Sequence, residues 1–441
     1  MIKKLSIVLL VLLALNIEAQ EGTTSPYSFY GIGSLNFKGT VENKSMGGLS
    51  IYTDSIHVNL RNPASYSGNN LKIGGFDNES RPVKFAVGGE LSSVNLKTSS
   101  QSAETGTTTF DYMVLSVPVG KFGIGFGLLP YTSVGYKLES SILLNDEEKL
   151  KNRYRGEGGV NKAFLGVGYQ ITEDLSFGID ASYNFGNIVN NAIEFAYDNE
   201  GNVLAYHSKE TNRSDLSGIN YNLGLSYTSM ITKKLQLSTG ITYTPKSKLT
   251  SANERVFSSI VINSATGEEF SINELESDLE SLGLDETKLT LPSKTAFGLG
   301  IGKPRKWFVG AEYTLLKTSQ YSNPIFNNNS NASFEDSSTF AIGGFYIPQY
   351  TSFNKYLKRV VYRAGAHYGN SGLKINDETI NEFGISFGVG LPVGKMFSNV
   401  NLGLEVGQRG TTNANLVKEN FLNFQLSLSL NDRWFVKRKY N

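Results

Sequence analysis

Alternation of apolar and polar residues with a period of two is the feature of this sequence that most constrains its fold. In the stretch NFQLSLSLN, residues 423–431, every second side chain is apolar and the others are polar. Residues 175–186 and 400–407 follow the same pattern. A period of two places successive side chains on opposite faces of a β-strand. Such segments, about 9–11 residues long and repeated without intervening helices, are what a transmembrane β-barrel requires.

The connections between these segments fall into two groups. Short turns such as PVGKF and ITEDL alternate with long polar connections at 99–107, 141–155, 196–215, 246–290 and 319–337. Short turns at one end and long loops at the other are typical of the periplasmic and extracellular ends of outer-membrane barrels. A soluble β-sandwich, the alternative for alternating strands, has shorter strands and does not separate its connections in this way.

We therefore predict an all-β fold, a 14-stranded antiparallel transmembrane β-barrel over residues 81–432, in the outer membrane of a Gram-negative bacterium. The predicted strands are 83–98, 109–118, 121–138, 157–171, 173–195, 214–231, 233–247, 291–302, 305–318, 336–347, 357–369, 380–392, 397–410 and 417–430. An even number of strands returns both termini to the periplasmic side, with a basic tail at 433–441.

The composition excludes several other classes of protein. Hydrophobic residues make up 39% of the chain and the mean hydropathy is −0.21, which argues against a helical membrane protein. The formal net charge of +1 is too small to favour nucleic acid as a partner. The chain has no Cys, so the sequence excludes disulfides, thiolate metal sites and a lipid anchor on a cysteine.

The N-terminal residues predict export and a segment that precedes the barrel. Lys3 and Lys4 are followed by an apolar run over residues 5–15, which is too short to span a bilayer. We predict a secretory signal peptide over residues 1–19. Residues 20–80 are rich in Gly, Ser and Asn and have too few apolar residues to build a separate core. We expect this segment to lie in the polar lumen of the barrel as a hatch.

One short helix is predicted within the long connection 246–290. Ser271 and Glu274 form a capping box, and Gly283 supplies a stop signal. The residues that would share the apolar face of the helix are Leu275, Leu279 and Leu282. We expect the helix to be a lid over neighbouring loops or an outer landing surface for a hydrophobic ligand.

Several residues of the 20–80 segment resemble the N-terminal hatch of the FadL family, outer-membrane transporters of long-chain fatty acids and other hydrophobic molecules. The residues that carry the resemblance are Gly31, Gly33, Met46, Gly47, Gly48, Asp54, Asn59, Arg61, Asn62, Pro63 and Ala64. The resemblance implies a hatch with an Asn-Pro-Ala motif, a helical fourth extracellular loop, and a kinked third strand that opens the wall sideways. It also implies passive uptake of a hydrophobic small-molecule ligand, without a cofactor, and release into outer-membrane lipids.

The third predicted strand contains a feature that fits such a kink. Pro130 lies in its middle, where a proline cannot donate to a β-ladder. Gly127, Tyr131 and Gly135 lie close to it in the sequence. We predict a lateral opening of the wall at these four residues.

The Asn-Pro-Ala motif is predicted to latch that opening. Pro63 biases Asn62 toward extended geometry, which leaves the Asn62 amide free to donate and accept hydrogen bonds. We expect Asn62 and the small Ala64 to pack into the break at Pro130 and to satisfy the backbone groups that the proline frees.

An alternative function comes from the same resemblance. Some members of the FadL family do not transport lipids and serve as partner subunits of a large protein-secretion channel. A transport-inactive barrel that acts as an accessory subunit of an outer-membrane secretion translocon is therefore the second candidate. The sequence leaves both functions open.

Charged residues at lumen-facing strand positions are candidates for a polar network. They are Glu90, Asp180, Glu312, Arg363 and Glu405. A charge in a narrow lumen is unfavourable unless it is paired. We expect these residues either to tie the hatch to the wall or to bind the polar head group of a ligand.

The sequence predicts neither a catalytic site nor a metal site. The Gly-x-Ser-x-Gly pattern at 384–388 lies inside an alternating strand, whereas a nucleophile elbow needs a strand that turns sharply into a helix. Ser386 is therefore predicted to face the lumen. His57, His207 and His367 do not have the spacing of metal ligands. We predict that the chain is not an enzyme.

Overall fold

The computed structural model describes residues 22–54, 56–68, 81–144, 147–198, 200–263, 265–326, 331–394, 398–432 and 434. Over these residues the chain forms a closed, antiparallel, 14-stranded β-barrel, which confirms the predicted fold class. The predicted signal peptide, residues 69–80 of the predicted hatch and nearly all of the predicted C-terminal tail lie outside the described residues. No helix among the described residues is long and apolar enough to cross a membrane.

The barrel wall is a single sheet in which consecutive strands are neighbours. Eleven of the fourteen wall positions are each filled by one strand. These strands are β2 (Val83–Lys97), β3 (Ser102–Val119), β4 (Phe122–Leu144), β5 (Glu147–Gln170), β6 (Leu175–Ala196), β7 (His207–Met230), β13 (Trp307–Leu316), β16 (Val361–Ile375), β17 (Glu378–Pro392), β18 (Asn399–Arg409) and β19 (Lys418–Asp432). The sheet closes because β19 pairs with β2 along its whole length, from Lys418 opposite Lys97 to Asp432 opposite Val83.

Three positions in the wall are filled by two strands in succession. They are β8 (Gln236–Thr244) with β9 (Ser247–Ile262), β11 (Glu286–Leu291) with β12 (Lys294–Lys303), and β14 (Ala332–Phe334) with β15 (Ser337–Tyr346). The registers show this arrangement, since β7 pairs first with β8 and then with β9. The short helical turns outside the N-terminal segment are η3 (Thr318–Gln320), η4 (Pro324–Phe326), η5 (Tyr356–Lys358) and η6 (Asn413–Asn415).

The alternation read from the sequence corresponds to the two faces of the wall. On β19, Phe424 and Leu426 are 58% and 49% exposed on the outer surface, whereas Gln425 and Ser427 between them are buried on the inner side. An apolar outer face and a polar inner face are what a barrel in a lipid bilayer needs.

All fourteen predicted strands are present, but several are longer than predicted. The connections 99–107, 141–155 and 196–215, predicted as loops, are largely parts of β3, β5 and β7. These extensions are polar on both faces, because they continue beyond the apolar outer surface. The apolar alternation that marks a strand within a bilayer is therefore missing, and the prediction of long loops there was wrong.

The helix predicted around Leu275, Leu279 and Leu282 is also absent. Its first half is β10 (Glu269–Glu276), which pairs with β9, and its second half is a series of turns. Leu275 and Leu282 are 70% and 64% exposed, and only Leu279 is buried. A single short helix is marginal without packing, whereas the edge of β9 offers a ladder of hydrogen bonds to an extended chain.

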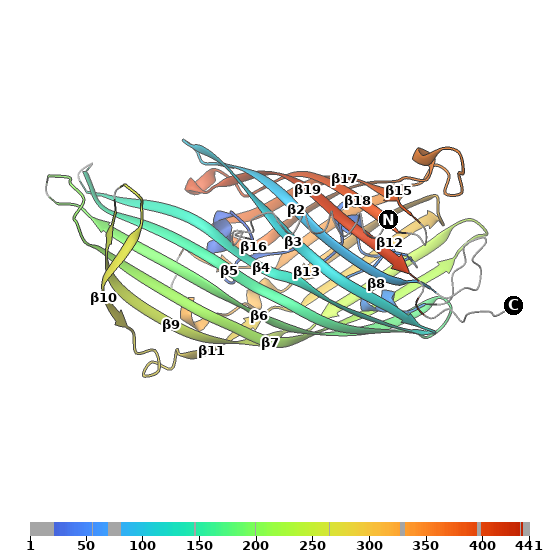
Figure 1. Ribbon diagram of the computed structural model, residues 1–441, viewed down its shortest axis with the longest axis horizontal. Helices are drawn as coiled ribbons and strands as arrows, with labels where there is room; N and C mark the ends of the chain where they lie inside the picture. The colour runs from blue at the N-terminus through green and yellow to red at the C-terminus, as the bar shows by residue number, and fades with distance from the viewer. Residues whose placement is uncertain are drawn as a thin grey trace.

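The N-terminal segment, residues 22–54 and 56–68, lies inside the barrel. Its elements are η1 (Pro26–Phe29), β1 (Ser34–Leu35), α2 (Val41–Lys44) and η2 (Pro63–Tyr66). Figure 1 shows these dark blue elements between the strands of the wall. The segment contacts inward-facing residues from most of the wall strands, so the lumen is where its side chains find their partners.

Candidate functional site

Ion pairs and hydrogen bonds join the N-terminal segment to the barrel wall. The Lys44 ammonium lies 2.9 Å from the Glu90 carboxylate and 2.8 Å from that of Asp111. The Arg61 guanidinium lies 2.7 Å from Glu312, which also accepts hydrogen bonds from the backbone N–H and the hydroxyl of Ser50. The segment is therefore held on opposite sides of the lumen.

Two further charged wall residues reach the segment, one directly and one through another side chain. Asp180 lies 3.5 Å from the Lys38 ammonium, and it accepts a hydrogen bond from the wall residue Asn222. Arg363 donates to the side-chain oxygen of Asn401, whose amide nitrogen donates to Glu42 of α2.

Glu405 differs from the other charged residues named from the sequence. Its ion-pair and hydrogen-bond partners among the described residues, His367 at 3.6 Å and Asn423 at 3.3 Å, are both on the wall. Four of the five charges named from the sequence thus reach the N-terminal segment, directly or through one side chain, and Glu405 does not.

The environment of Lys44 keeps its side chain charged. Burial alone would lower the pKa of the Lys44 ammonium, but the carboxylates of Asp111 and Glu90 outweigh burial and raise this pKa above its ordinary value. The two carboxylates of the wall therefore stabilise the charged form of Lys44.

The Asn-Pro-Ala motif caps the short helical turn η2. The side-chain oxygen of Asn62 accepts a hydrogen bond from the backbone N–H of Ala64 at 3.0 Å, and the Asn62 amide donates to the carbonyl oxygen of Leu225 on β7. Pro63 occupies the first position of the turn, where its missing N–H leaves no partner unsatisfied.

Inward-facing glycines of four wall strands form the surface on which η2 lies. A Cβ on Gly178 would lie 2.3 Å from the carbonyl carbon of Pro63, and a Cβ on Gly123 would lie 1.9 Å from the Tyr66 carbonyl oxygen. The other glycines of this cradle are Gly125, Gly166, Gly168 and Gly224. The sequence shows these glycines clearly, but their role depends on a segment far away in the chain.

The predicted contact between Asn62 and the break at Pro130 is wrong. Both polar atoms of the Asn62 side chain are used elsewhere, by Ala64 and by Leu225. The local reason is that the N-cap geometry of η2 turns the Asn62 oxygen toward its own turn, which leaves only the amide to reach the wall.

The wall itself is split between β3 and β4. The two strands pair from Val119 opposite Phe122 to Met113 opposite Leu128, and no pairing continues beyond these residues. Each strand has an irregularity close to this level. The pairing of β4 with β5 skips Tyr131, between Pro130 and Thr132, and the pairing of β3 with β2 skips Asp111. An extra residue bends a strand and increases its twist, so both strands are irregular at the level where their pairing ends.

The residues predicted for a lateral opening lie along this split. Gly127 pairs with Val114 in the last part of the β3–β4 ladder, and Pro130, Tyr131 and Gly135 follow on the separated part of β4. Figure 1 shows the hairpin of β2 and β3 rising away from β4 and β5.

The separated edge of β4 is covered by the N-terminal segment. Ser34 and Leu35 of β1 pair with Ser133 and Thr132. The backbone N–H of Asn36 donates to the carbonyl oxygen of Tyr131. In η1, earlier in the segment, the hydroxyl of Ser28 accepts a hydrogen bond from the backbone N–H of Gly135 at 3.2 Å. Residues 28–36, rather than Asn62, therefore satisfy the backbone groups at the split.

An apolar cluster lines the lumen beside this edge. Its buried residues are Ile32, Val134, Tyr136, Val160, Ile188, Leu216, Leu249, Leu289 and Leu291, with Phe29 and Tyr131 packed against them. The cluster spans the inner face from β4 round to β11, and Phe29 and Ile32 of the N-terminal segment fill its centre. We refer to it below as the luminal apolar cluster.

Two lysines point into the lumen near this cluster without an acidic partner. The Lys162 side chain is 95% buried, and its ammonium lies 4.2 Å from the centre of the Tyr131 ring. Within the described part of the chain, neither Lys162 nor Lys294 has an ion-pair or hydrogen-bond partner for its ammonium. The sequence analysis missed both lysines, although each occupies a lumen-facing strand position.

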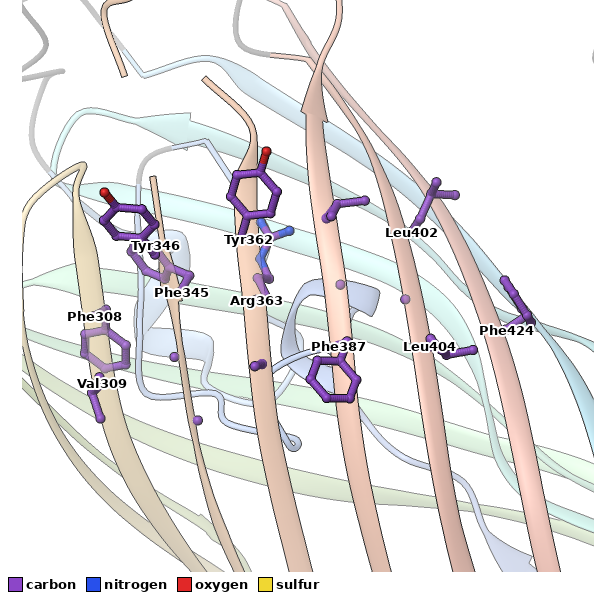
Figure 2. Close-up of a pocket in the computed structure, with 16 residues that line it drawn as sticks. Phe308, Val309, Phe345, Tyr346, Tyr362, Arg363, Phe387, Leu402, Leu404 and Phe424 are labelled. Carbon is purple, nitrogen blue, oxygen red and sulfur yellow. The ribbon is translucent and has the colours of Figure 1, made fainter. Parts of the chain in front are cut away.

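The outer surface of the barrel has a separate hollow of about 830 Å³. Figure 2 shows it between Val309, Tyr346, Tyr362, Phe387, Leu402, Leu404 and Phe424. Its floor is formed where the small residues Gly344 and Ala364 lie opposite each other on β15 and β16. The hollow belongs to the apolar outer face, and the luminal apolar cluster faces the other way.

Residues considered for catalysis or metal binding have structural partners. Ser386 faces the lumen, as predicted, and its hydroxyl accepts from the backbone N–H of Gly47. His57 pairs with Asp54, and His367 contacts Glu382. Over the described residues, no group of three or more His, Asp or Glu side chains could hold a metal ion.

Comparisons with known proteins agree with this architecture. A family model described as BamG matches residues 1–441. The toluene transporter TodX of Pseudomonas putida is 17% identical, with a TM-score of 0.57, over 91% of this chain and 100% of that chain. A FadL homologue of Pseudomonas aeruginosa is 11% identical, with a TM-score of 0.55, over 91% and 99%. The CymD monoaromatic hydrocarbon channel is 15% identical, with a TM-score of 0.52, over 91% and 100%.

The family model matches the whole chain, whereas the solved structures are similar to it mainly in fold. At such low identities the solved structures show a shared fold and nothing more, and they confirm the FadL-type barrel that the sequence indicated. No curated protein matches the sequence.

Proposed function

The chain belongs to the BamG family. From its FadL-type barrel we propose that it is an outer-membrane channel for the passive uptake of hydrophobic compounds. The compounds enter the lumen from the side of the long strand extensions and leave sideways into the bilayer between β3 and β4. Both termini then lie on the periplasmic side. The structural neighbours TodX and CymD are named as a toluene transporter and a monoaromatic hydrocarbon channel, which supports this class of ligand.

The observation that carries the proposal is the position of the luminal apolar cluster. An apolar surface inside a polar barrel is a binding surface for an apolar molecule. This one includes Val134 and Tyr136 of β4, the strand whose edge is separated from β3. An apolar molecule on the cluster is therefore next to the split in the wall, and residues 28–36 lie in its way.

The two unpaired lysines support a ligand with an anionic end, such as a long-chain fatty acid. A buried ammonium without a counter-ion is unfavourable, and a carboxylate would relieve it. Lys162 follows Val160 of the cluster on the same face of β5, and Lys294 follows Leu291 at the junction of β11 and β12. A fatty acid can thus place its chain on the cluster and its carboxylate near the lysines.

A reversible cross-link tests the exit route. The chain has no Cys, so a Ser34→Cys and Ser133→Cys pair introduces the only disulfide. These two residues are direct register partners of β1 and β4, a spacing that suits a disulfide. We expect the oxidised variant to lose uptake of a radiolabelled long-chain fatty acid, and reduction with dithiothreitol to restore it.

A matched pair separates the gate from the cross-link itself. Ser208 and Ser259 are register partners in the continuous wall formed by β7 and β9. A Ser208→Cys and Ser259→Cys pair should leave uptake unchanged in both redox states. Normal uptake by the oxidised Ser34 and Ser133 pair would rule out exit past β1.

The second candidate is a transport-inactive barrel that serves as a partner subunit of an outer-membrane protein-secretion channel. Membership of the BamG family, rather than of a family described by a transported compound, favours it. Purification in a mild detergent distinguishes the two functions. A large partner in stoichiometric amount, together with an absence of uptake in vesicles that contain the purified barrel, would favour the second candidate.

A further inference from the structure

The hairpin of β2 and β3 has one edge without a neighbouring strand. β3 pairs with β2 from Ser102 onward, but with β4 only from Met113 to Val119. Among the described residues, those at 102–112 thus have a sheet neighbour on one side only. Figure 1 shows that the hairpin diverges from β4.

Most of this edge lies beyond the apolar part of the outer face. Leu91 on β2 and Phe110 on β3 are exposed apolar residues on the outer face. Farther along the same face, β2 continues with Ser93, Asn95 and Lys97, and β3 with Thr108, Gly106 and Glu104. The apolar surface ends at Leu91 and Phe110, so the unpaired backbone groups of residues 102–109 are accessible to a partner.

The edge has almost none of the features that keep edge strands from pairing. Natural edge strands are protected by Lys, Pro, short length, bulges or a covering segment. The sequence SAETGTTTF at 102–110 has no Lys, Arg or Pro, and Glu104 is its only charged residue. Thr105, Thr107, Thr108 and Thr109 are β-branched residues that favour a strand. The bulge at Asp111 lies below this stretch.

The opposite side of the opening shows that it accepts added strands. The edge of β4 at Thr132 and Ser133 is already paired with β1, a strand of two residues that comes from a distant part of the chain. A segment that enters above β1 meets the edge of β3. Residues 102–110 offer a template of about 30 Å at roughly 3.4 Å per residue.

We propose that the β3 edge over residues 102–110 binds one extended segment of a partner protein, which joins the barrel sheet as an added β-strand. Backbone hydrogen bonds provide the affinity in this mode of recognition, and alternate side chains provide the specificity. The threonines at 105, 107 and 109 line one face of the docked strand. The interface does not depend on whether the barrel transports a ligand.

The first test asks whether the edge is open in the purified full chain. Neighbouring backbone amides of a strand point to opposite sides. Hydrogen–deuterium exchange should therefore find fast and slow amides alternating over residues 103–109, with at least a tenfold difference in rate. Uniform protection of all these amides would mean that the edge is already paired, and would overturn the proposal.

The second test uses a peptide with the sequence of residues 90–97, ELSSVNLK, in which one serine is replaced by Cys. This sequence pairs with β3 in the barrel, so its backbone suits the same template. Single Cys variants of the chain at Thr105, Thr107 and Thr109 share one face, and the variant at Thr108 lies on the other. A docked strand predicts that disulfide yields on one face of β3 are at least tenfold above those on the other face.

Two controls complete this test. A peptide with proline in place of alternate residues should be captured at background level. Thr107→Pro and Thr108→Pro each remove one amide donor of β3, one on the side of β2 and the other on the open edge. The variant whose β2–β3 amides stay protected has lost the donor on the open edge, and it should abolish capture. Equal yields on both faces, capture of the proline peptide, or disulfide-linked dimers of the chain in place of the peptide adduct would each overturn the proposal.

Discussion

Replacing Glu312 tests whether buried ion pairs hold the N-terminal segment in the lumen. Its side chain is 3% exposed and that of Arg61 is 10% exposed, so water screens their 2.7 Å contact very little. In Glu312→Ala the Arg61 guanidinium loses its counter-ion, and the N–H and hydroxyl of Ser50 lose their acceptor. Arg61 keeps only its hydrogen bonds to the Gly48 carbonyl and the Thr314 hydroxyl.

The expected magnitude follows from these contacts. Removing one partner of a buried ion pair destabilises a structure by about 3–5 kcal/mol. Since about 1.4 kcal/mol corresponds to a factor of ten, the population in which the segment is released should rise by roughly two to four orders of magnitude. The backbone ladder of β13 does not depend on Glu312, so the barrel should remain closed.

Hydrogen–deuterium exchange measures the effect directly. Amides of residues 41–68 should exchange faster in Glu312→Ala by that factor, while amides of β13 and β15 stay protected and the barrel stays heat-modifiable on gels. Asp215→Asn is the matched control, because it removes a carboxylate from the exposed pair with Arg213 and should change nothing in the lumen. Less than a threefold change in exchange over residues 41–68 would refute the argument that this pair anchors the segment.

Three further predictions follow from contacts of the N-terminal segment. Gly33 has a φ of 92°, and a Cβ there would lie 2.3 Å from the Ser133 carbonyl oxygen. Gly33→Val should therefore displace β1 and increase the permeability of proteoliposomes to a hydrophobic dye. Unchanged permeability would show that β1 does not close the wall. In Gly178→Val the new side chain meets Pro63, so η2 should be displaced and the amides of residues 62–66 should exchange faster while the barrel stays intact. The control Gly201→Val, in an open turn, should have no such effect. Protease added to intact cells should cleave the exposed turn at 265–268 and spare residues 22–68, and cleavage within 22–68 would place that segment outside the lumen.

The barrel was readable from the sequence because each wall strand sits between lipid and a polar lumen. That arrangement imposes the alternation seen in residues 423–431, and it marks all fourteen strands. The same logic fails outside the bilayer. Residues 102–109 of β3 and 207–215 of β7 continue beyond the apolar outer surface, so they form strands without an apolar period. At β10, a capping box and three leucines indicated a helix, but pairing with the edge of β9 outweighed that local preference.

The candidate site was less predictable because it is built from contacts between distant residues. Pro130 marks an irregularity of β4 by its own chemistry, and the position of the split is close to it. Which segment covers the split is not a local property. Asn62 has a suitable side chain, yet residues 28–36 lie there, since the N-cap of η2 and the glycine cradle place Asn62 against β7. Lys162 escaped notice because an unpaired lysine is recognised only when its surroundings are known.

In the proposed uptake channel, the N-terminal segment has two parts, an anchor and a gate that covers the edge of β4. Unpaired backbone groups within a bilayer are unfavourable by several kcal/mol each, so the part of β4 at membrane depth needs a hydrogen-bonding partner at all times. Residues 38–66 carry the ion pairs of Lys38, Lys44 and Arg61 and the packing of η2, and they can stay in place while a ligand passes. Residues 28–36 hold β4 through two register pairs, a few hydrogen bonds and the packing of Phe29 and Ile32 in the luminal apolar cluster, without an ion pair among the described residues. Movement of this part alone would open the wall, and the adjoining luminal apolar cluster would bring an apolar molecule to the edge at the moment when β1 leaves it.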